Sequence, residues 1–144
     1  SVPRECQTQS MLRCWVSLTA LTLLAGCAAS LEPPTYPQTV AGGVAGDYQL
    51  YHEIVLTGEQ VPKGVPTAGL IRAVQLVYNA SNPIQVTVFE TRGSGFAREA
   101  EQRWRDHDGR HAKRMGRYFV VGQGEKPDPR TIEAFLRDLE KQLN

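Results

Sequence analysis

The sequence LIRAVQLVYNASNPIQVTVFE, residues 70–90, decides the fold. Its two halves, residues 70–79 and 84–90, are rich in the β-branched and aromatic residues that favour strands. The residues between the halves, Ala80-Ser81-Asn82-Pro83, are of types that favour turns. This pattern predicts a β-hairpin. Apolar residues occur on both faces of its strands, so we expect the hairpin to lie in the centre of a sheet.

Two further strands are expected outside the hairpin. Residues 47–57 alternate between apolar and polar types, and residues 117–122 (RYFVVG) form a short β-rich run. The Gly- and Pro-rich residues 58–69 predict a loop, and residues 109–116 predict a turn-rich basic segment. A strand near Thr39–Val40 is compatible with the sequence, although the pattern does not require one.

Two helices complete the predicted domain. Residues 94–104 have helical spacing of their apolar residues, with Ser94 as the expected N-cap. The last helix has Asp128 as its expected N-cap and Pro129 at its first position. Its apolar stripe consists of Ile132, Phe135, Leu136, Leu139 and Leu143. The order β-β-β-α-β-α predicts an α+β fold, an antiparallel sheet of about four strands with both helices packed on one face.

A different stretch, Met11–Cys27, predicts where the protein is located. One basic residue, Arg13, precedes the apolar run Trp15–Ala25, which is shorter than the roughly 20 residues needed to span a bilayer. This is the order of a secretory signal peptide, with Met11 as the expected initiator after an upstream extension. The last four residues, Leu24-Ala25-Gly26-Cys27, resemble the lipobox of bacterial lipoprotein signal peptides. A retained core or membrane helix is the alternative.

The resemblance implies a covalent lipid on Cys27. In such lipoproteins a diacylglyceryl group is attached to the cysteine thiol, the chain is cleaved between the residues equivalent to Gly26 and Cys27, and the new N-terminus is usually acylated. Two or more acyl chains anchor a protein stably. The residue after the cysteine is Ala28. In Gram-negative lipoproteins, a residue other than Asp at this position favours sorting to the outer membrane. The implied location is the cell envelope, lipid-anchored to a bacterial membrane, on the periplasmic side of the outer membrane in a Gram-negative cell.

The chain is therefore expected to have three parts: an upstream extension and signal peptide (1–26), a lipid-anchored flexible linker (27–46) and a globular domain (47–144). Prolines and glycines in the linker favour an extended, flexible backbone. The overall composition, 41% hydrophobic and 22% charged, is that of an ordinary globular protein. Without residues 1–26, basic and acidic residues balance, which argues against a nucleic-acid partner. No cysteine remains for a disulfide once Cys27 is acylated.

A His- and Asp-rich segment, DHDGRH (residues 106–111), is one candidate site. The spacing of His107 and His111 could place two imidazoles on one metal ion if the segment were helical. Gly109 disfavours a helix there, and the nearby cations Arg105, Arg110, Lys113 and Arg114 oppose a bound metal ion. A solvated helix end and loop is therefore the favoured interpretation. An envelope enzyme or metal-binding protein using His107, Asp108 and His111 is the alternative.

Basic residues cluster between Arg103 and Arg117 and form a second candidate site. The candidate ligand or anion surface consists of Trp104, Arg105, His107, His111 and Arg114. Lipid headgroups, peptidoglycan carboxylates or an acidic envelope protein would suit such a surface, and a plain solvated surface is the alternative.

A catalytic constellation is not found in the sequence. Ser94 lies in Gly93-Ser94-Gly95, but Arg92 and Phe96 stand where a Gly-x-Ser-x-Gly nucleophile elbow needs glycines. We therefore predict no catalytic residue, no metal and no cofactor apart from the lipid. The domain resembles small bacterial envelope lipoproteins of similar strand and helix order, a resemblance that implies no activity. The sequence predicts a non-catalytic binding or accessory domain with membrane lipid and an envelope protein as partners. A structural subunit of an envelope complex is the further hypothesis.

Overall fold

The computed structural model describes residues 34–41, 46–79, 82–106, 109–126 and 128–143. Its folded unit begins at Thr35. Tyr36 and Val40, which the sequence pattern assigns to the linker, are buried in the hydrophobic core. The folded unit therefore starts at Thr35, twelve residues before the expected boundary at residue 47. The lipobox, Leu24-Ala25-Gly26-Cys27, lies outside the described residues.

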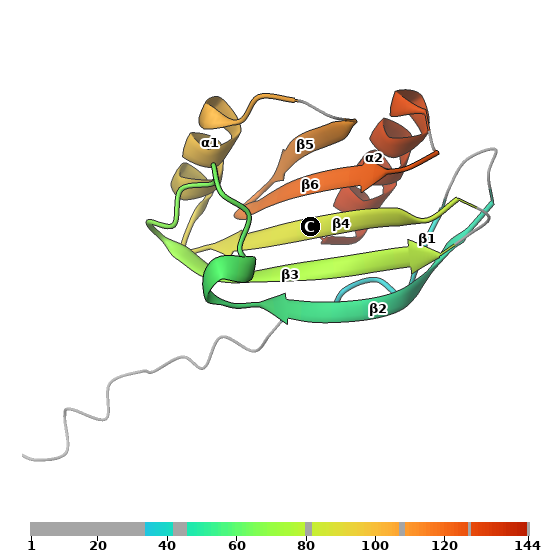
Figure 1. The fold of residues 1–144 in the computed structure, drawn as a ribbon, viewed down its shortest axis with the longest axis horizontal. Helices are drawn as coiled ribbons and strands as arrows, with labels where there is room; N and C mark the ends of the chain where they lie inside the picture. The colour runs from blue at the N-terminus through green and yellow to red at the C-terminus, as the bar shows by residue number, and fades with distance from the viewer. Residues whose placement is uncertain (1–33, 42–45, 80–81, 107–108, 127, 144) are drawn as a thin grey trace, which may run out of the picture. The chain divides into compact units, whose positions relative to one another are not determined.

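The described chain forms an antiparallel sheet with two α-helices, which confirms the α+β class. The strand order is β1-β2-β3-β4-β6-β5, and each neighbouring pair is antiparallel (Figure 1). The strands are β1 (Thr39–Val40), β2 (Tyr48–Leu56), β3 (Leu70–Asn79), β4 (Ile84–Thr91), β5 (Arg110–Met115) and β6 (Tyr118–Gly124). The helices are α1 (Ser94–Arg103) and α2 (Pro129–Leu143), and a short 3-10 turn, η2, spans Gly58–Gln60. As expected, the β3–β4 hairpin is central.

The sheet has six strands, so the expected count of about four is wrong. The main omission is β5, which the sequence pattern assigns to a turn-rich basic segment. Its sequence, RHAKRM, has a single strongly apolar residue, Met115, and that side chain is fully buried. A tight turn through Gly116 (φ 59°) and Arg117 then joins β5 to β6. The cationic composition of β5 therefore does not predict a strand, and its pairing with β6 specifies one.

The two helices pack against opposite faces of the sheet, so the expectation that both cover one face is wrong. Along β6, Tyr118 and Val120 belong to the cluster that contains α2 residues, whereas Phe119 and Val121 belong to the cluster that contains α1 residues. Successive side chains of a strand point to opposite faces. Both faces of β4 and β6 are apolar in this region, so each face needs its own helix. We call these faces the α1 face and the α2 face.

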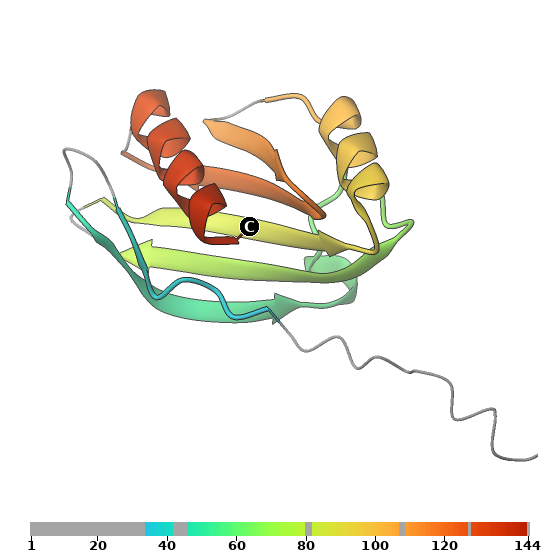
Figure 2. The same ribbon diagram turned by 180° about the vertical axis from the view of Figure 1, so that it is seen from behind.

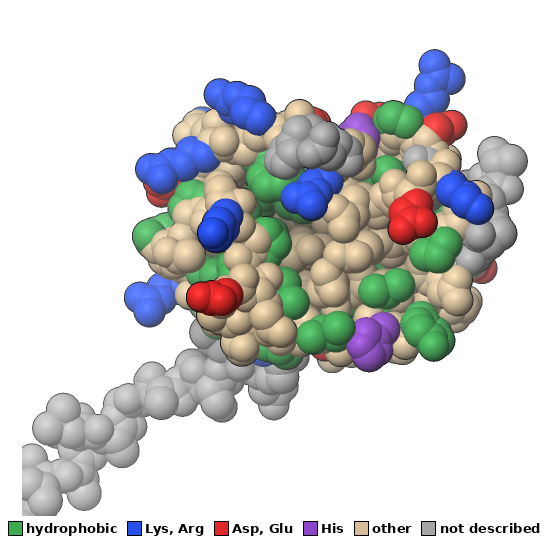
Figure 3. Space-filling view, in the orientation of Figure 1, with side chains coloured by type: hydrophobic (Ala, Val, Ile, Leu, Met, Phe, Trp, Pro, Cys, Tyr) green, Lys and Arg blue, Asp and Glu red, His purple; other side chains and the backbone are tan. Residues whose placement is uncertain are grey.

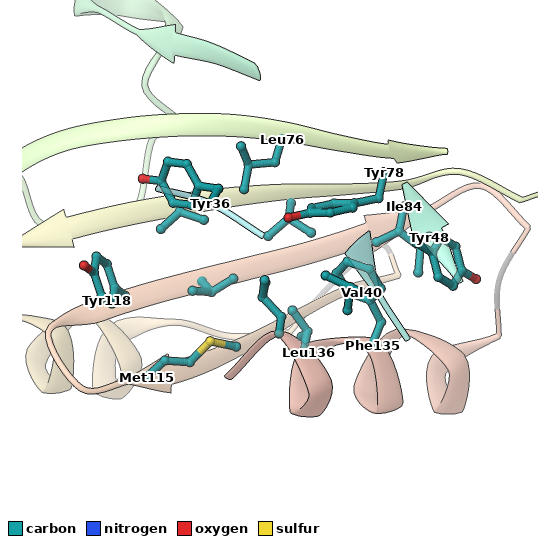
Figure 4. Packing of buried hydrophobic residues seen from close by; sticks show 14 of the residues in the cluster. Tyr36, Val40, Tyr48, Leu76, Tyr78, Ile84, Met115, Tyr118, Phe135 and Leu136 are labelled. Carbon is teal, nitrogen blue, oxygen red and sulfur yellow. The ribbon is translucent and has the colours of Figure 1, made fainter. Parts of the chain in front are cut away.

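The α2 face carries the larger core (Figure 4). Phe135 of α2 packs edge-on against Tyr48 and Tyr78, with ring centroids 5.2 and 5.1 Å apart. Gly122 of β6 permits this close approach, because a Cβ atom there would lie 3.1 Å from Ile132 Cγ2. Helix α2 lies behind β5 and β6 in Figure 1 and in front of them in Figure 2.

The helix starts differ in their capping. Asp128 Oδ1 accepts a hydrogen bond of 2.8 Å from the Thr131 backbone N–H, which confirms Asp128 as the N-cap of α2. The expected cap of α1 is wrong by one residue, since Gly93 is the N-cap and Ser94 is the first helical residue. The Gly93 backbone is extended, and α1 therefore begins without a side-chain capping hydrogen bond.

Candidate functional site

The α1 face changes from apolar to polar along its strands. Residues paired across neighbouring strands form rows, which follow from the strand register. The row beneath α1 is apolar: Ala73, Phe89 and Phe119. The next row is Gln75, Thr87 and Val121, and the row after it is Val77, Gln85 and Gln123. Polar side chains thus begin where the cover provided by α1 ends.

Two adjoining hollows occupy this polar part of the α1 face. One has a volume of about 450 Å³ and the other of about 720 Å³, both are open to solvent, and both are lined by Gln85 and Gln123. We call the combined hollow the glutamine trough. Its floor consists of Gln75, Gln85, Thr87 and Gln123. Trp104 and Arg110 form one wall, and Gln60 and Lys63 form the other. Glu125 and Lys126 lie at the far end. Figure 3 views this face, where blue cationic side chains lie above, to the left and to the right of a largely uncharged centre, and green hydrophobic side chains lie along its lower edge.

Different parts of the fold hold the trough in place. The floor residues lie on β3, β4 and β6, which occupy the middle of the sheet. One wall is the turn after β2, where the Gln60 side-chain oxygen accepts a 3.1 Å hydrogen bond from the Thr57 backbone N–H. This is the reciprocal contact of a capping box, and it fixes the start of η2.

Trp104 is held on the opposite wall. Its indole packs edge-on against Phe119 at a centroid distance of 5.8 Å, and its Nε1 donates to Asp106 Oδ1 at 2.9 Å. The same carboxylate oxygen accepts from the Ala112 backbone N–H at 3.3 Å. Asp106 therefore joins the end of α1 to the start of β5 and orients the tryptophan at the trough.

The trough has an excess of positive charge. Lys63, Arg110 and Lys126 line it, and Glu125 is the acidic residue that lines it. Among the ion pairs of the described residues, none uses these three cations. By contrast, Lys113 of β5 lies 2.8 Å from Glu140. An anionic ligand could therefore use the rim cations without displacing a carboxylate of the domain.

A buried charged cluster lies on the α2 face. The fully buried Glu90 carboxylate lies 2.7 Å from Arg72 Nε and 3.0 Å from Arg117 Nη2. Neither oxygen receives a well-directed hydrogen bond, so these contacts are ion pairs with imperfect alignment. Burial, and next the Glu90 charge, raise the pKa of the nearby Tyr36 phenol. Two arginines around one buried carboxylate compensate its desolvation, so this cluster has a structural role.

The candidate anion surface predicted from the sequence is distributed over several places. Trp104 lines the trough, and the Arg105 guanidinium donates to the carbonyl oxygens of Gln102 and Trp104 at 3.0 and 2.8 Å. His111 pairs across the ladder with Gly122, and Arg114 with Phe119, so their side chains point to opposite faces of the sheet. The described members of this group therefore do not share one face.

The metal site that the sequence offers as an alternative lies partly outside the described residues. His107 and Asp108 are not described, and His111 lies on the α2 face of β5. Within the described part of the chain, no group of three or more His, Cys, Asp or Glu side chains could hold a metal ion. The described helices also include none with the length and apolar character needed to cross a membrane.

The sequence pattern does not identify the trough glutamines as a site. A signal is present, because Gln85 and Thr87 alternate with apolar residues in β4, and Gln75 and Gln123 each interrupt an apolar run. Only the register brings all of them together, however, since Gln123 comes from β6, which is distant along the chain from the β3–β4 hairpin.

The fold and this site define an α+β domain with a polar trough on one sheet face. No protein-family model, no curated protein and no solved structure matches the chain.

Proposed function

We propose that this protein is a lipid-anchored lipoprotein of the bacterial envelope whose folded domain binds a ligand without catalysing a reaction. The glutamine trough is the binding site. The observation that carries this proposal is a pair of adjoining hollows, of about 720 and 450 Å³, that share the uncharged amides of Gln85 and Gln123. Ligand sites are typically concave, with a small number of convergent polar groups.

The trough residues are suited to recognition. Gln75, Gln85 and Gln123 each present one acceptor oxygen and one donor NH₂ group, and these groups bind polar ligands without proton transfer. The floor belongs to the middle of the sheet, so the backbone that carries its side chains is fixed before a ligand arrives. Rigid sites bind more tightly because less conformational entropy is lost on association.

The proposed anchor rests on the lipobox Leu24-Ala25-Gly26-Cys27. It would keep the domain close to one membrane, so the ligand would be an envelope component. Its test is Cys27→Ser in the full-length chain, followed by metabolic labelling with a radioactive fatty acid. We expect no label and an uncleaved precursor. Label that persisted in the variant would exclude acylation at this cysteine.

The binding role is tested by site-specific photo-crosslinking in cells. A photoreactive phenylalanine replaces Gln85 in the trough of the full-length protein. The matched control replaces Glu133, which is exposed on α2 at the other face of the sheet. We expect covalent adducts from position 85 and not from position 133. Equal yields from both positions, or no adduct from position 85, would contradict a binding role for the trough.

A further inference from the structure

We infer that the ligand of the glutamine trough is an acidic glycan, a chain of sugar rings that carries carboxylates. This inference rests on the proposed function, because it names the class of ligand for the same site. Charge, hydrogen-bonding capacity and the position of the trough in the sheet each point to this class.

The charge of the rim favours an anion. Lys63 and Arg110 stand on opposite walls, and Lys126 is at the far end, with Glu125 as the opposing charge. Among the described residues these three cations form no ion pair. Cations on two walls and at one end would contact negative groups that are spread along a chain. Such complementary charge contributes to specificity and to the rate of association.

The floor favours a ligand rich in hydroxyl groups. A sugar hydroxyl donates one hydrogen bond and accepts others, as does the floor residue Thr87. The amides of Gln85 and Gln123 are cross-strand neighbours, so they can meet adjacent hydroxyls of one ring. In the 450 Å³ hollow, Leu56, Pro62 and Trp104 provide apolar surface for the C–H face of a sugar.

The position of the trough disfavours an extended peptide. Peptides commonly bind by adding a strand to a sheet edge, where backbone N–H and C=O groups are available. The trough instead lies over β3, β4 and β6, and β4 is paired on both sides along its length. Recognition there must use side chains, which suits a ligand that offers hydroxyls and carboxylates.

The test is calorimetric titration of the full-length protein with three probes of equal length: oligogalacturonate, a neutral cello-oligosaccharide and oligoglutamate. We expect oligogalacturonate to bind on the order of tenfold or more tightly than either of the others, with an affinity that falls as salt is raised. Equal binding of the neutral glycan would overturn the role of charge. Equal binding of oligoglutamate would overturn the glycan and leave a general polyanion site.

Matched variants connect any binding to the trough. Lys63→Gln, Arg110→Gln and Lys126→Gln together should weaken oligogalacturonate binding by on the order of tenfold or more. The control triple variant, Arg98→Gln, Arg130→Gln and Arg137→Gln, removes the same charge from exposed helix positions and should leave binding unchanged. An equal loss of oligogalacturonate affinity in both triple variants would overturn the assignment of the site. If the trough triple variant fails to fold, the single variants Lys63→Gln, Arg110→Gln and Lys126→Gln are compared with the single control variants. If no glycan binds while photo-crosslinking from position 85 persists, the inference fails and the proposed binding role stands.

Discussion

Lys113 and Arg114 are neighbours on β5, yet they form ion pairs with helices on opposite faces of the sheet. Lys113 Nζ lies 2.8 Å from Glu140 Oε2 of α2, and Arg114 Nε lies 3.2 Å from Glu101 Oε2 of α1. The alternation of strand side chains makes this arrangement possible. A short basic strand at the sheet edge thus contacts both helices.

Removing either ion pair should have a small effect. Lys113→Gln or Arg114→Gln is expected to lower the free energy of unfolding by about 0–1 kcal/mol, because both pairs are partly exposed. Urea unfolding monitored by circular dichroism measures the change. Arg103→Gln, which removes an exposed pair within α1, is the matched control. A loss above about 2 kcal/mol would show that β5 contributes more to helix docking than exposed ion pairs normally do.

Gly69 should not tolerate a side chain. Its φ is +74°, and a Cβ atom there would meet the ring of Phe96. Gly69→Ala is expected to destabilise the domain by about 1–3 kcal/mol through backbone strain and overpacking. The control is Gly95→Ala, at a helical position where a Cβ atom would meet open space, which should stabilise by about 0.5–1 kcal/mol. Thermal unfolding of both variants tests the contrast, and an unchanged stability for Gly69→Ala would contradict it.

Glu90→Gln should be strongly destabilising. The substitution leaves Arg72 and Arg117 facing a neutral amide in a buried position, and breaking such a pair typically costs about 3–5 kcal/mol. The arginine side chains are 22% and 35% exposed, so water can solvate them in part and the loss should fall near the lower limit. Chemical unfolding measures it. A loss below about 1 kcal/mol would mean that the ion pairs do little more than balance the desolvation of Glu90.

The start of α2 should give the domain a pH dependence in acid. Hydrogen bonds from Thr131 lower the pKa of Asp128 below its ordinary value of 3.8. The contribution of the Asp128 carboxylate to stability is therefore complete above that ordinary value, and it is lost as the pH falls through the lower pKa of the folded state. Asp128→Asn keeps a capping oxygen but does not titrate. We expect the melting temperatures of the wild type and this variant to converge in acid, and a constant difference would contradict the assignment.

The sequence predicts those parts of the fold that depend on local pattern. The β3–β4 hairpin has turn residues and β-branched runs, and α2 has Asp128, Pro129 and a continuous apolar stripe. These signals are local, and the elements form as expected. The α+β class follows from them.

The rest requires tertiary information. Strand β5 is cationic, so only its pairing with β6 identifies it as a strand. The placement of the helices depends on which face each one covers, and Phe119 and Val120 show that both faces of β6 are buried. The trough depends on register, since Gln75, Gln85 and Gln123 come together from three strands. A local pattern contains none of these long-range relationships.

Side chains alternate along β4, so neighbouring residues of this strand have different roles: one set packs in the core and the other lines the trough. Val86 and Val88 are committed to the core, whereas Gln85 and Thr87 face the trough. Substitutions at the second pair can therefore change ligand preference while the interior stays intact, so relatives of this protein could diverge in specificity without losing the fold. An inserted residue is different, because a shift of one position would exchange the two sets. Variation in this strand should therefore be tolerated as replacement and rejected as insertion or deletion.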